Sequence, residues 1–341
     1  MSDSIISKNR ASVNMEKYRT HRKECESLAS VYKYLFEEAL FVADQNRWED
    51  KEDRVRHCGT FLMGSIYEKG NERKYVLEGA NFCRVMLCPM CQWRRALKLY
   101  SSMLRIWKLV FDDYRVIEFD ESKHRIAPPL RGLLLTLTVP NCSGAQLRDE
   151  LEHMAEAWDR LVRTKQFKQS IKGYYRCVEV TYNASNDTYH PHYHVLLLVT
   201  DDYFSKGKDD YIAQEQWLEM WRKAMRDNTI TQVDIRALRG STPQAMLKNL
   251  NETCKYTCKP SDFLQGSIEQ RAKIVETVDK ALDGIRRASF GGWLKEARRA
   301  LKLDDEDELY TDESEDVLSE WRKVVPMVWL HWDSGLGDYI E

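Results

Sequence analysis

Two neighbouring segments, GYYRCVEVTY at residues 173–182 and HPHYHVLLLV at residues 190–199, have the clearest strand pattern in the sequence. In both segments successive side chains point to alternate sides, which is the period of a β-strand with two different faces. The residues between them begin NASNDT, and asparagine, serine and aspartate favour a tight turn. The pattern therefore predicts a β-hairpin with antiparallel strands.

Strand-like and helical periods continue on both sides of this hairpin. LLLTLTV at 133–139 predicts a strand, and residues 145–164 predict an amphipathic helix. After the hairpin, residues 211–226 predict a second helix and residues 233–237 a last strand. The order β-α-β-β-α-β predicts an α+β fold, with a central antiparallel sheet of the split βαβ type flanked by helices.

The rest of the chain divides by composition. Residues 1–57 predict a helical N-terminal region, and residues 58–110 a cysteine-rich, zinc-binding region with a basic helix. The sheet is expected within residues 130–262. Residues 263–341 are expected to form a helical C-terminal region, and the acidic stretch 304–320 within it is interpreted as a solvated linker.

The composition is typical of a soluble globular protein. Of 341 residues, 43% are hydrophobic and 31% are charged, and no apolar run is long enough to span a bilayer. The opening MSDSIISKNR lacks the apolar core of a signal peptide. The nine cysteines are therefore expected to be thiols or metal ligands in the cytoplasm, with no membrane partner.

The net charge is unevenly distributed along the chain. The formal charge is −2, and residues 304–320 contribute −10 of it, so the remainder carries +8. A remainder of that sign permits binding to a phosphate backbone without proving it.

Two histidines in the second strand of the hairpin are candidate metal ligands. His192 and His194 are two residues apart, so both project from one face, about 7 Å apart along the strand. Glu179, between Val178 and Val180 in the first strand, has its carboxylate on the side opposite to both valines. A carboxylate beside two imidazoles suits Mg²⁺ or Mn²⁺ that must also bind a substrate phosphate. Two ordinary interpretations stay open, a polar sheet face for the histidines and an exposed strand acid for Glu179.

A helix is predicted from Pro243 to Lys259, after Ser241 and Thr242 as possible caps. Its buried stripe would hold Leu247, Leu250, Cys254 and Cys258. The opposite side would hold Glu252, Tyr256 and Lys259, with Lys248 and Lys255 beside them. A tyrosine one turn after a carboxylate and among lysines is well placed to meet a phosphate. Judged on this helix alone, a solvated helix face is the better interpretation.

The two features together favour nucleophilic chemistry on a phosphate. A phenol with a pKa near 10 is a weak nucleophile unless its pKa is lowered or the phosphorus is polarised. A cation held by the two histidines would polarise the phosphorus. Lysines nearby favour the phenolate and bind flanking phosphates.

The ordered set LLLTLTVPN, HPHYHVLLLV and ETCKYTCK resembles the rolling-circle plasmid replication initiators, the Rep proteins of the HUH endonuclease superfamily. The resemblance is to the branch with a single tyrosine, and it extends from about Cys58 to Lys259. It implies that residues 130–262 form a nicking domain that acts on single-stranded or cruciform plasmid origin DNA. It also implies a host replication helicase and polymerase as partners.

The resemblance assigns roles to residues that match the family motifs. His192 and His194 would hold the catalytic metal, and Tyr256 would attack the scissile phosphate, leaving a 5′-phosphotyrosyl link and a free 3′-OH primer. Glu252 would activate water and release the enzyme at the end of one round. Glu179 as the third ligand rests on strand geometry, and the family pattern supports it less firmly.

A cysteine cluster precedes the sheet. Cys83, Cys88 and Cys91 have the close spacing of metal thiolates, and Cys58 can complete four ligands for tetrahedral Zn²⁺. His57 is the adjacent rival for the fourth position. For the five other cysteines, packing or incidental thiols are strongly preferred.

The segment CPMCQWRR, which contains Arg94 and Arg95, resembles a segment of the same Rep family. We expect a structural zinc site that presents these arginines to DNA, and plain zinc-stabilised scaffolding is equally favoured.

Three other functions stay open. A non-catalytic, zinc-containing nucleic-acid-binding protein would keep its activity when Tyr256 is replaced. A metal hydrolase acting through bound water would cleave without a protein-linked product. HUH transposases and relaxases share the two-histidine motif, but relaxases place their tyrosine ahead of it, whereas Tyr256 follows it.

Overall fold

The fold is described from a computed structural model. It covers residues 13–112, 130–205, 211–238, 260–303 and 322–341. The chain divides into two compact units. Unit 1 comprises Met1–Ser101, Pro260–Glu276 and Glu306–Glu341, and unit 2 comprises Ser102–Lys259 and Thr277–Asp305.

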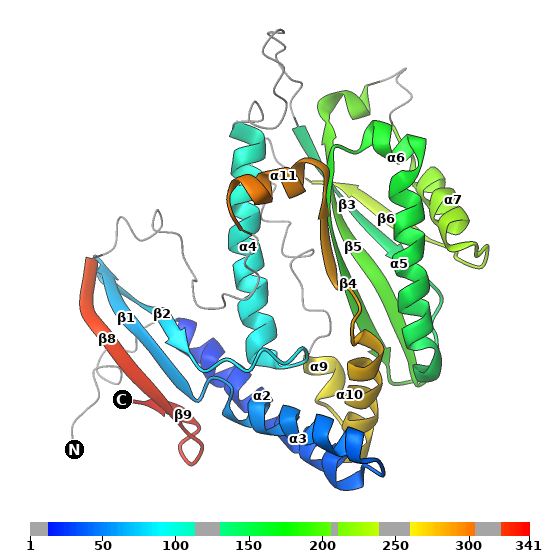
Figure 1. Cartoon of the computed structure of the whole chain (residues 1–341). Coiled ribbons are helices and arrows are strands. Elements are labelled where there is room, and N and C mark those ends of the chain that lie inside the picture. Colours follow the sequence, from blue (N-terminus) through cyan, green and yellow to red (C-terminus); the bar gives the residue numbers. More distant parts are fainter. Residues whose placement is uncertain (1–12, 113–129, 206–210, 239–259, 304–321) are drawn as a thin grey trace. The chain divides into compact units, whose positions relative to one another are not determined.

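Unit 2 is built around the predicted hairpin. Strands β4 (Gly173–Asn183) and β5 (Thr188–Thr200) pair antiparallel, and β3 (Leu130–Thr138) pairs with the other edge of β5. Strand β6 (Val233–Ala237) pairs with the other edge of β3, and β7 (Ala288–Gly291) pairs with the other edge of β4. The order is β6-β3-β5-β4-β7, and every pairing is antiparallel, which confirms the predicted antiparallel sheet in a mixed α and β protein (Figure 1).

Helices cover one face of this sheet. The η2 turn (Gly144–Gln146) leads into α5 (Leu147–Arg163), and α7 (Gln214–Met225) lies beside α5. The aromatic ring of Tyr193, on β5, contacts Trp158 of α5 and Trp221 of α7 at centroid distances of 6.2 and 6.3 Å. Apolar residues at the helical period form the buried stripe of α5: Leu147, Leu151, Met154, Trp158 and Leu161.

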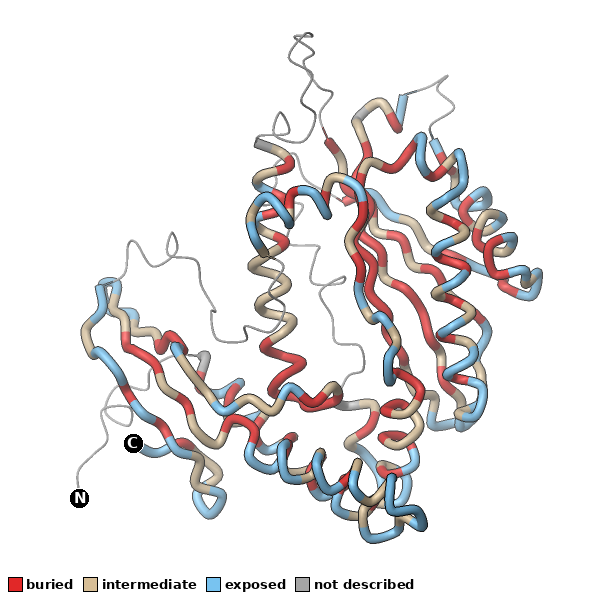
Figure 2. Tube along the Cα trace, in the orientation of Figure 1, coloured by how far each residue is buried: buried red, intermediate tan, exposed pale blue. Residues whose placement is uncertain are grey.

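The opposite face of the sheet presents the residues that alternate with Tyr193. In register, Glu179 pairs with His192 and Cys177 with His194, so all four lie on the side away from α5 and α7. Figure 2 shows the adjacent strands β3, β5 and β4 as largely buried. Shorter elements complete unit 2: α6 (Lys165–Ser170), η3 (Asp201–Phe204) and α11 (Gly292–Ala300).

A helical hairpin opens unit 1. Helix α2 (Val13–Glu38) buries Tyr18, Cys25 and Tyr32 on one side, at spacings close to two helical turns. Helix α3 (Val42–His57) packs against it, and the rings of Tyr32 and Trp48 stack with centroids 5.8 Å apart.

A four-stranded antiparallel sheet joins distant parts of the chain in unit 1. Strands β1 (Phe61–Lys69) and β2 (Glu72–Ala80) form a hairpin, and β1 also pairs with β8 (Arg322–Asp333). Strand β9 (Asp338–Ile340) pairs with β8. The other helices are α4 (Pro89–Asp112), α9 (Pro260–Phe263) and α10 (Ile268–Leu282), and α4 and α10 each contribute to both units.

The expected helical character of residues 263–341 is correct only in part. Helices α10 and α11 lie there, but β7, β8 and β9 are strands. In β8 the buried Val328 and Leu330 alternate with the exposed Trp329 and His331, which is the period of a strand.

Two predicted segments lie outside the described residues, the helix Pro243 to Lys259 and the acidic stretch 304–320. Among the helices that the structure describes, none has the length and apolar character needed to cross a membrane.

Candidate metal and nucleic-acid sites

Three predicted ligands meet on the face of the unit 2 sheet that points away from α5 and α7. His194 Nε2 lies 2.7 Å from Glu179 Oε2, and His192 Nε2 lies 3.3 Å from the same oxygen. The two imidazole nitrogens are 3.1 Å apart. The hairpin register places Glu179 directly opposite His192, and the strand period adds His194 on the same face. The structure therefore brings Glu179, His192 and His194 together as one group able to hold a metal ion.

The spacing of these atoms fits an octahedral cation. Neighbouring ligands of an ion bound at about 2.1 Å lie about 3.0 Å apart, and the three observed distances bracket that value. His192 Nδ1 lies 3.2 Å from the carbonyl oxygen of His190, to which a protonated Nδ1 donates. That hydrogen bond leaves the Nε2 lone pair free for a metal. The donor set, one carboxylate and two imidazoles, fits Mg²⁺ or Mn²⁺ with further positions for phosphate oxygens.

Glu179 is almost completely buried, with 3% of its surface exposed, so the alternative of an ordinary exposed strand acid is wrong. Burial alone would raise the pKa of its carboxyl. Hydrogen bonds from His192 and His194, and the charges of both rings, outweigh burial and hold that pKa well below its usual range. Glu179 is therefore an anion at neutral pH, as a metal ligand requires.

A third histidine shares this face and had no place in the sequence analysis. His190 precedes His192 by two residues, and the two ring centroids are 5.4 Å apart. Burial, and then the charge of His192, lower the pKa of His190. The signal that could have found it is the strand period, because residues 190, 192 and 194 all alternate with Tyr193 and its neighbours.

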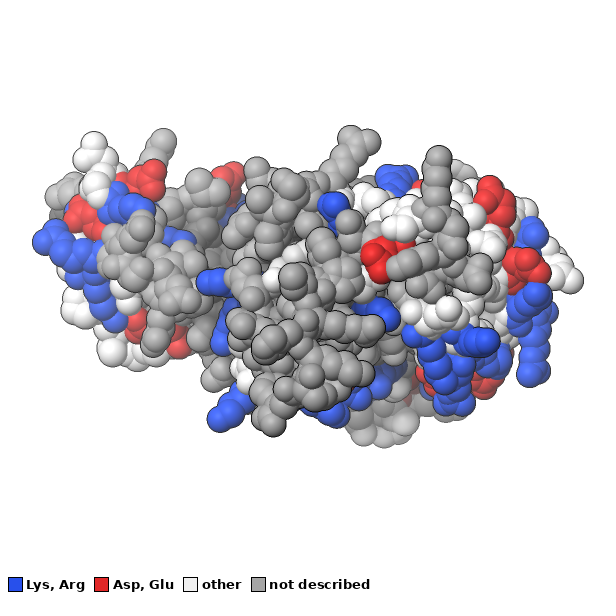
Figure 3. All heavy atoms as spheres, turned by 90° about the horizontal axis from the view of Figure 1, so that it is seen from above, with Lys and Arg blue, Asp and Glu red and all other residues white. Residues whose placement is uncertain are grey.

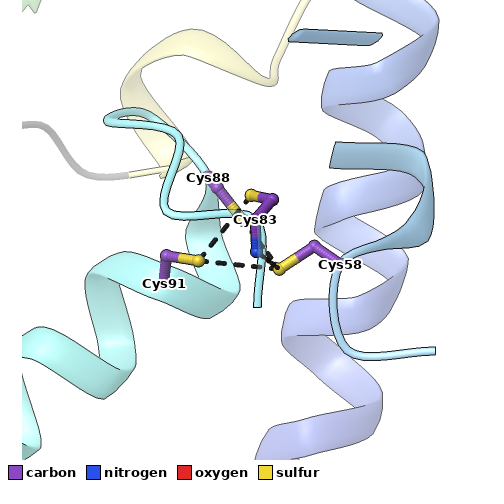
Figure 4. A group of neighbouring side chains, drawn as sticks. All are labelled: Cys58, Cys83, Cys88 and Cys91. Atoms are coloured by element: carbon purple, nitrogen blue, oxygen red, sulfur yellow. Dashed lines mark hydrogen bonds between the residues drawn. The ribbon is translucent and has the colours of Figure 1, made fainter. Parts of the chain in front are cut away.

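The four predicted cysteines form a second cluster, in unit 1 (Figure 4). The Sγ atoms of Cys58 and Cys91 are 3.6 Å apart, those of Cys83 and Cys91 are 3.7 Å apart, and those of Cys88 and Cys58 are 3.5 Å apart. Tetrahedral Zn²⁺ with Zn–S bonds of about 2.3 Å separates its sulfur atoms by about 3.8 Å. The cluster therefore has the dimensions of a four-thiolate zinc site.

Backbone amides support thiolates at this cluster. The amide of Arg84 donates to Cys91 Sγ at 3.2 Å, and that of Cys83 donates to Cys58 Sγ at 3.3 Å. Arg84 adopts a φ of 60°, which turns the chain between Cys83 and the helix that bears Cys91. Side-chain hydrogen bonds from Cys58, Cys83 and Cys88 hold the pKa of the Cys91 thiol well below its ordinary value.

The rival ligand His57 is directed elsewhere. Its side chain is 62% exposed, and its Nδ1 lies 2.8 Å from the carbonyl oxygen of Asp53, one turn earlier in α3. The fourth member of the cluster is Cys58.

Cys25, expected to be a packing or incidental thiol, is fully buried on α2 and is not one of the four grouped thiols. Its burial fits the packing interpretation, but its contact with the cluster, with Sγ 3.5 Å from Cys88 Sγ, was not predicted. Nearby, the buried Arg22 donates to the carbonyl oxygen of Cys58 at 2.9 Å. Neither contact has a local signal in the sequence, because α2 and the cluster are far apart along the chain.

The two arginines after the cluster have different environments. Arg94 is only 1% exposed, it donates to the Tyr18 hydroxyl at 3.1 Å, and its guanidinium lies 5.7 Å from the Phe82 ring centroid. This burial contradicts the predicted DNA contact of Arg94, whose charge is stabilised among aromatic rings. Arg95 is half-buried and donates to the carbonyl oxygen of Arg84 at 2.7 Å.

The predicted nucleophile and its neighbours belong to residues 239–259, which the structure does not describe. Tyr256, Glu252, Lys248, Lys255 and Lys259 all lie outside the described residues. Their roles stay proposals.

Fold and sites together define an α+β protein with antiparallel sheets and two groups of side chains fit to bind metal ions. The family model Rep_1, described as "Replication protein", matches residues 74–340. The chain therefore belongs to this family of replication proteins, and the predicted resemblance to rolling-circle plasmid Rep proteins is confirmed.

The names of similar proteins support the same family. A "Protein rep" of Streptococcus pneumoniae serotype 2 is 34% identical over 276 residues, 80% of this chain and 80% of the relative. A "Protein rep" of Lentilactobacillus hilgardii is 32% identical over 292 residues, 85% and 87% of the two chains. Another from Staphylococcus aureus is 36% identical over 218 residues, 63% of this chain and 85% of its own. No solved structure matches the chain with significance.

Proposed function

We propose that this protein is a metal-dependent DNA endonuclease and strand transferase of the HUH type, which initiates rolling-circle replication of a plasmid. Its substrate would be a single-stranded or cruciform region of the plasmid origin. The observation that supports this most is the convergence of Glu179, His192 and His194, at distances of 2.7 to 3.3 Å, on the sheet face that points away from α5 and α7. The order of strands and helices in unit 2 supports a split βαβ domain of the same type.

Glu179, His192 and His194 would hold Mg²⁺ or Mn²⁺. When bound, the cation supplies polarisation of the scissile phosphate. Each imidazole Nε2 lies within 3.3 Å of the buried Glu179 Oε2, so the three donor atoms face one common position for the cation. The His190 carbonyl oxygen fixes the ring of His192 from the other side.

Tyr256 would be the nucleophile. Its phenolic oxygen forms a bond to phosphorus, the bond from phosphorus to the 3′-oxygen breaks, and the 3′-oxygen takes up a proton to give a free 3′-OH. The phenolic proton passes to solvent, and positive charge on Lys248, Lys255 and Lys259 favours the phenolate and binds the flanking phosphates. The product is a 5′-phosphotyrosyl link whose bond energy allows later rejoining.

Glu252 would end the reaction cycle. One helical turn before Tyr256, its carboxylate can accept a proton from water as the water oxygen attacks phosphorus. Tyr256 then leaves as the phenol, and the enzyme is released after one round. The 3′-OH made in the first step would prime a host polymerase, with a host helicase opening the duplex.

The four-cysteine cluster would hold a structural Zn²⁺ in unit 1. Cys91 lies in the first turn of α4, Cys83 and Cys88 lie in the segment that leads into this helix, and Cys58 follows α3. A bound ion would therefore link two parts of unit 1. Arg95, in the first turns of α4, would contact DNA, because it is partly exposed whereas Arg94 is buried.

The test is a covalent adduct. Wild-type protein, incubated with single-stranded origin DNA labelled at its 3′ end and with Mn²⁺, is expected to form a complex that survives denaturing electrophoresis. Tyr256→Phe and His192→Ala should abolish this complex, whereas Glu252→Ala should form it and release DNA poorly. Tyr193→Phe, which keeps the ring between α5 and α7, is the matched tyrosine control and should form the adduct normally.

Other outcomes would favour other functions. An undiminished adduct in Tyr256→Phe would overturn the assignment of the nucleophile. Cleavage without any adduct would indicate a hydrolase that acts through water. DNA binding with neither cleavage nor adduct would indicate a non-catalytic, zinc-containing nucleic-acid-binding protein.

A further inference from the structure

Unit 1 has an exposed cluster of aromatic side chains on its four-stranded sheet. Phe61 of β1 contacts Trp329 and His331 of β8, with ring centroids 5.1 and 5.2 Å apart. Met63 pairs in register with Trp329 on the same face. We call Phe61, Met63, Trp329 and His331 the aromatic platform. Trp329 is 46% exposed and His331 is exposed, which is unusual for large rings in a sheet.

The platform is not the core face of this sheet. The residues that alternate with it, Leu62 and Leu330, are completely buried. The rings of the platform are tilted against one another by 41° and 51°, so no ring is stacked flat on its neighbour. Among the described residues, Trp329 and His331 are exposed and Phe61 is partly exposed, so a flat partner can reach these rings from solvent.

Basic side chains lie at the other end of the same sheet. Lys323 Nζ lies 5.8 Å from the centroid of the Tyr67 ring and is paired with Glu78 at 2.9 Å. Register places Lys74 opposite Tyr67, on the face that Phe61 also occupies. Arg73 and Arg322 both pair with Glu68, at 3.5 and 3.3 Å. The strand ends there carry an excess of positive charge, with five basic and three acidic residues: Lys69, Arg73, Lys74, Arg322 and Lys323, with Glu68, Glu72 and Glu78. Figure 3 shows lysine and arginine side chains over these strand ends at its left.

From these observations we propose that the platform binds single-stranded DNA by stacking unpaired bases on Phe61, Trp329 and His331, with the basic strand ends following the phosphates. Aromatic rings that stack bases, on a surface that elsewhere carries positive charge for the phosphates, are the chemistry of sequence-tolerant single-strand binding. Tyr67 comes six positions after Phe61, which is about 20 Å along the strand. A segment of a few nucleotides can span this distance. A duplex, whose bases are already stacked and paired, offers no free base to these rings.

This inference deepens the proposed function, because a nicking initiator must hold unpaired origin DNA. It concerns a surface of unit 1, separate in the chain from Glu179, His192, His194 and Tyr256.

The test compares binding of single-stranded and duplex DNA by the full-length protein. A fluorescein-labelled 12-mer of thymidylate and the duplex of the same length are titrated without added Mg²⁺ or Mn²⁺, and the anisotropy is measured. Trp329→Ala is expected to weaken single-strand binding about tenfold, because stacking on one ring accounts for roughly that factor. Trp329→Phe should restore most of the affinity, and duplex binding should change less than twofold in both variants.

Phe41→Ala is the matched control, since Phe41 is a 70% exposed aromatic side chain of the same unit, outside the sheet. It should bind like the wild type. His331→Ala provides a second variant if thermal melting shows that Trp329→Ala is misfolded.

Three results would overturn the proposal. The first is an unchanged single-strand affinity in a folded Trp329→Ala variant, and the second is equal weakening of single-strand and duplex binding in that variant. The third is loss of self-association by the Trp329→Ala variant in sedimentation, which would make the platform an interface between copies of the protein. Because DNA binding is measured without the catalytic cation, the binding test can fail while the adduct test succeeds, and the adduct test can fail while the binding test succeeds. The failure of each proposal is thus distinguishable.

Discussion

Glu179 is the residue on which the candidate catalytic site depends. Its carboxylate is buried, its pKa is held low by His192 and His194, and it contacts both Nε2 atoms. Glu179→Gln keeps the shape and removes the charge, so we expect Mn²⁺ affinity measured by calorimetry to fall at least about tenfold. Glu219→Gln removes a carboxylate that is paired with Lys223 on the surface of α7 and should leave the affinity unchanged. Equal affinities in both variants would remove Glu179 from the site.

The cysteine cluster yields a prediction about metal content. Purified wild-type protein should hold about one Zn²⁺ per chain, measured by atomic emission, and Cys91→Ser should lose it. Cys142→Ser should retain it, because burial and the charge of Glu150 raise the pKa of Cys142 to about 11 and it lies in unit 2. Cys25→Ser should also retain zinc, since Cys25 is not one of the four grouped thiols. Zinc in the Cys91→Ser protein would contradict the ligand set.

For individual residues, the sequence was sufficient to predict a group of side chains that lie close together along the chain. The two-residue period of one hairpin was enough to place Glu179 with His192 and His194. Cys25 beside Cys88 and the burial of Arg94 could not be predicted, because both depend on how α2 packs against the start of α4. An arginine in a basic run has no local signal that distinguishes a DNA contact from a buried cation among rings.

Strand β4 is held in the unit 2 sheet partly by a buried arginine. Arg176 is 3% exposed, its guanidinium lies 4.2 Å from the Tyr193 ring centroid, and it donates to Ser289 Oγ of β7 at 3.3 Å. Arg176→Ala should lower the free energy of unfolding by about 2 to 3 kcal/mol in urea denaturation, because it leaves a cavity and an unpaired hydroxyl. Arg236→Ala, at a largely exposed arginine in β6, should change it by less than about 0.5 kcal/mol. A similar small change in Arg176→Ala would show that this contact does not hold β4.

At the element scale, long periodic segments were predicted close to their observed bounds. The expected helix 145–164 is η2 and α5, and the expected strands of the hairpin are β4 and β5, each longer by one to a few residues. The β1–β2 hairpin was not predicted. It lies between Cys58 and Cys83, where the cysteine spacing dominated the interpretation, and its apolar residues alternate less regularly because β-bulges shift the register.

At the scale of the whole molecule, the C-terminal strands complete unit 1. Strand β8 pairs with β1, and its buried Leu330 lies in register with Leu62. Leu330→Asp places a charge in this core, so it should destabilise unit 1 by about 3 kcal/mol or more and lower the first thermal transition in calorimetry. Met327→Asp, at a side chain 54% exposed in the same strand, is the matched control and should leave the melting curve unchanged. Equal melting of the two variants would mean that β8 is not part of the core.

This long-range pairing also sets the limit of prediction from sequence. A strand near residue 330 has no local reason to pair with one near residue 62, since the choice depends on which edge of β1 is left open by β2. Residues 263–341 were expected to be helical, and their strands β7, β8 and β9 were not predicted. The family, in contrast, was predictable, because short ordered motifs in the chain suffice to recognise it.

The proposed function depends on a covalent bond between Tyr256 and DNA. This bond can be detected by mass spectrometry of the wild-type protein after reaction with single-stranded origin DNA and Mn²⁺, followed by nuclease and protease digestion. We expect one peptide that carries a 5′-linked nucleotide on Tyr256. A nucleotide on another residue, or complete cleavage with every peptide unmodified, would contradict the proposal.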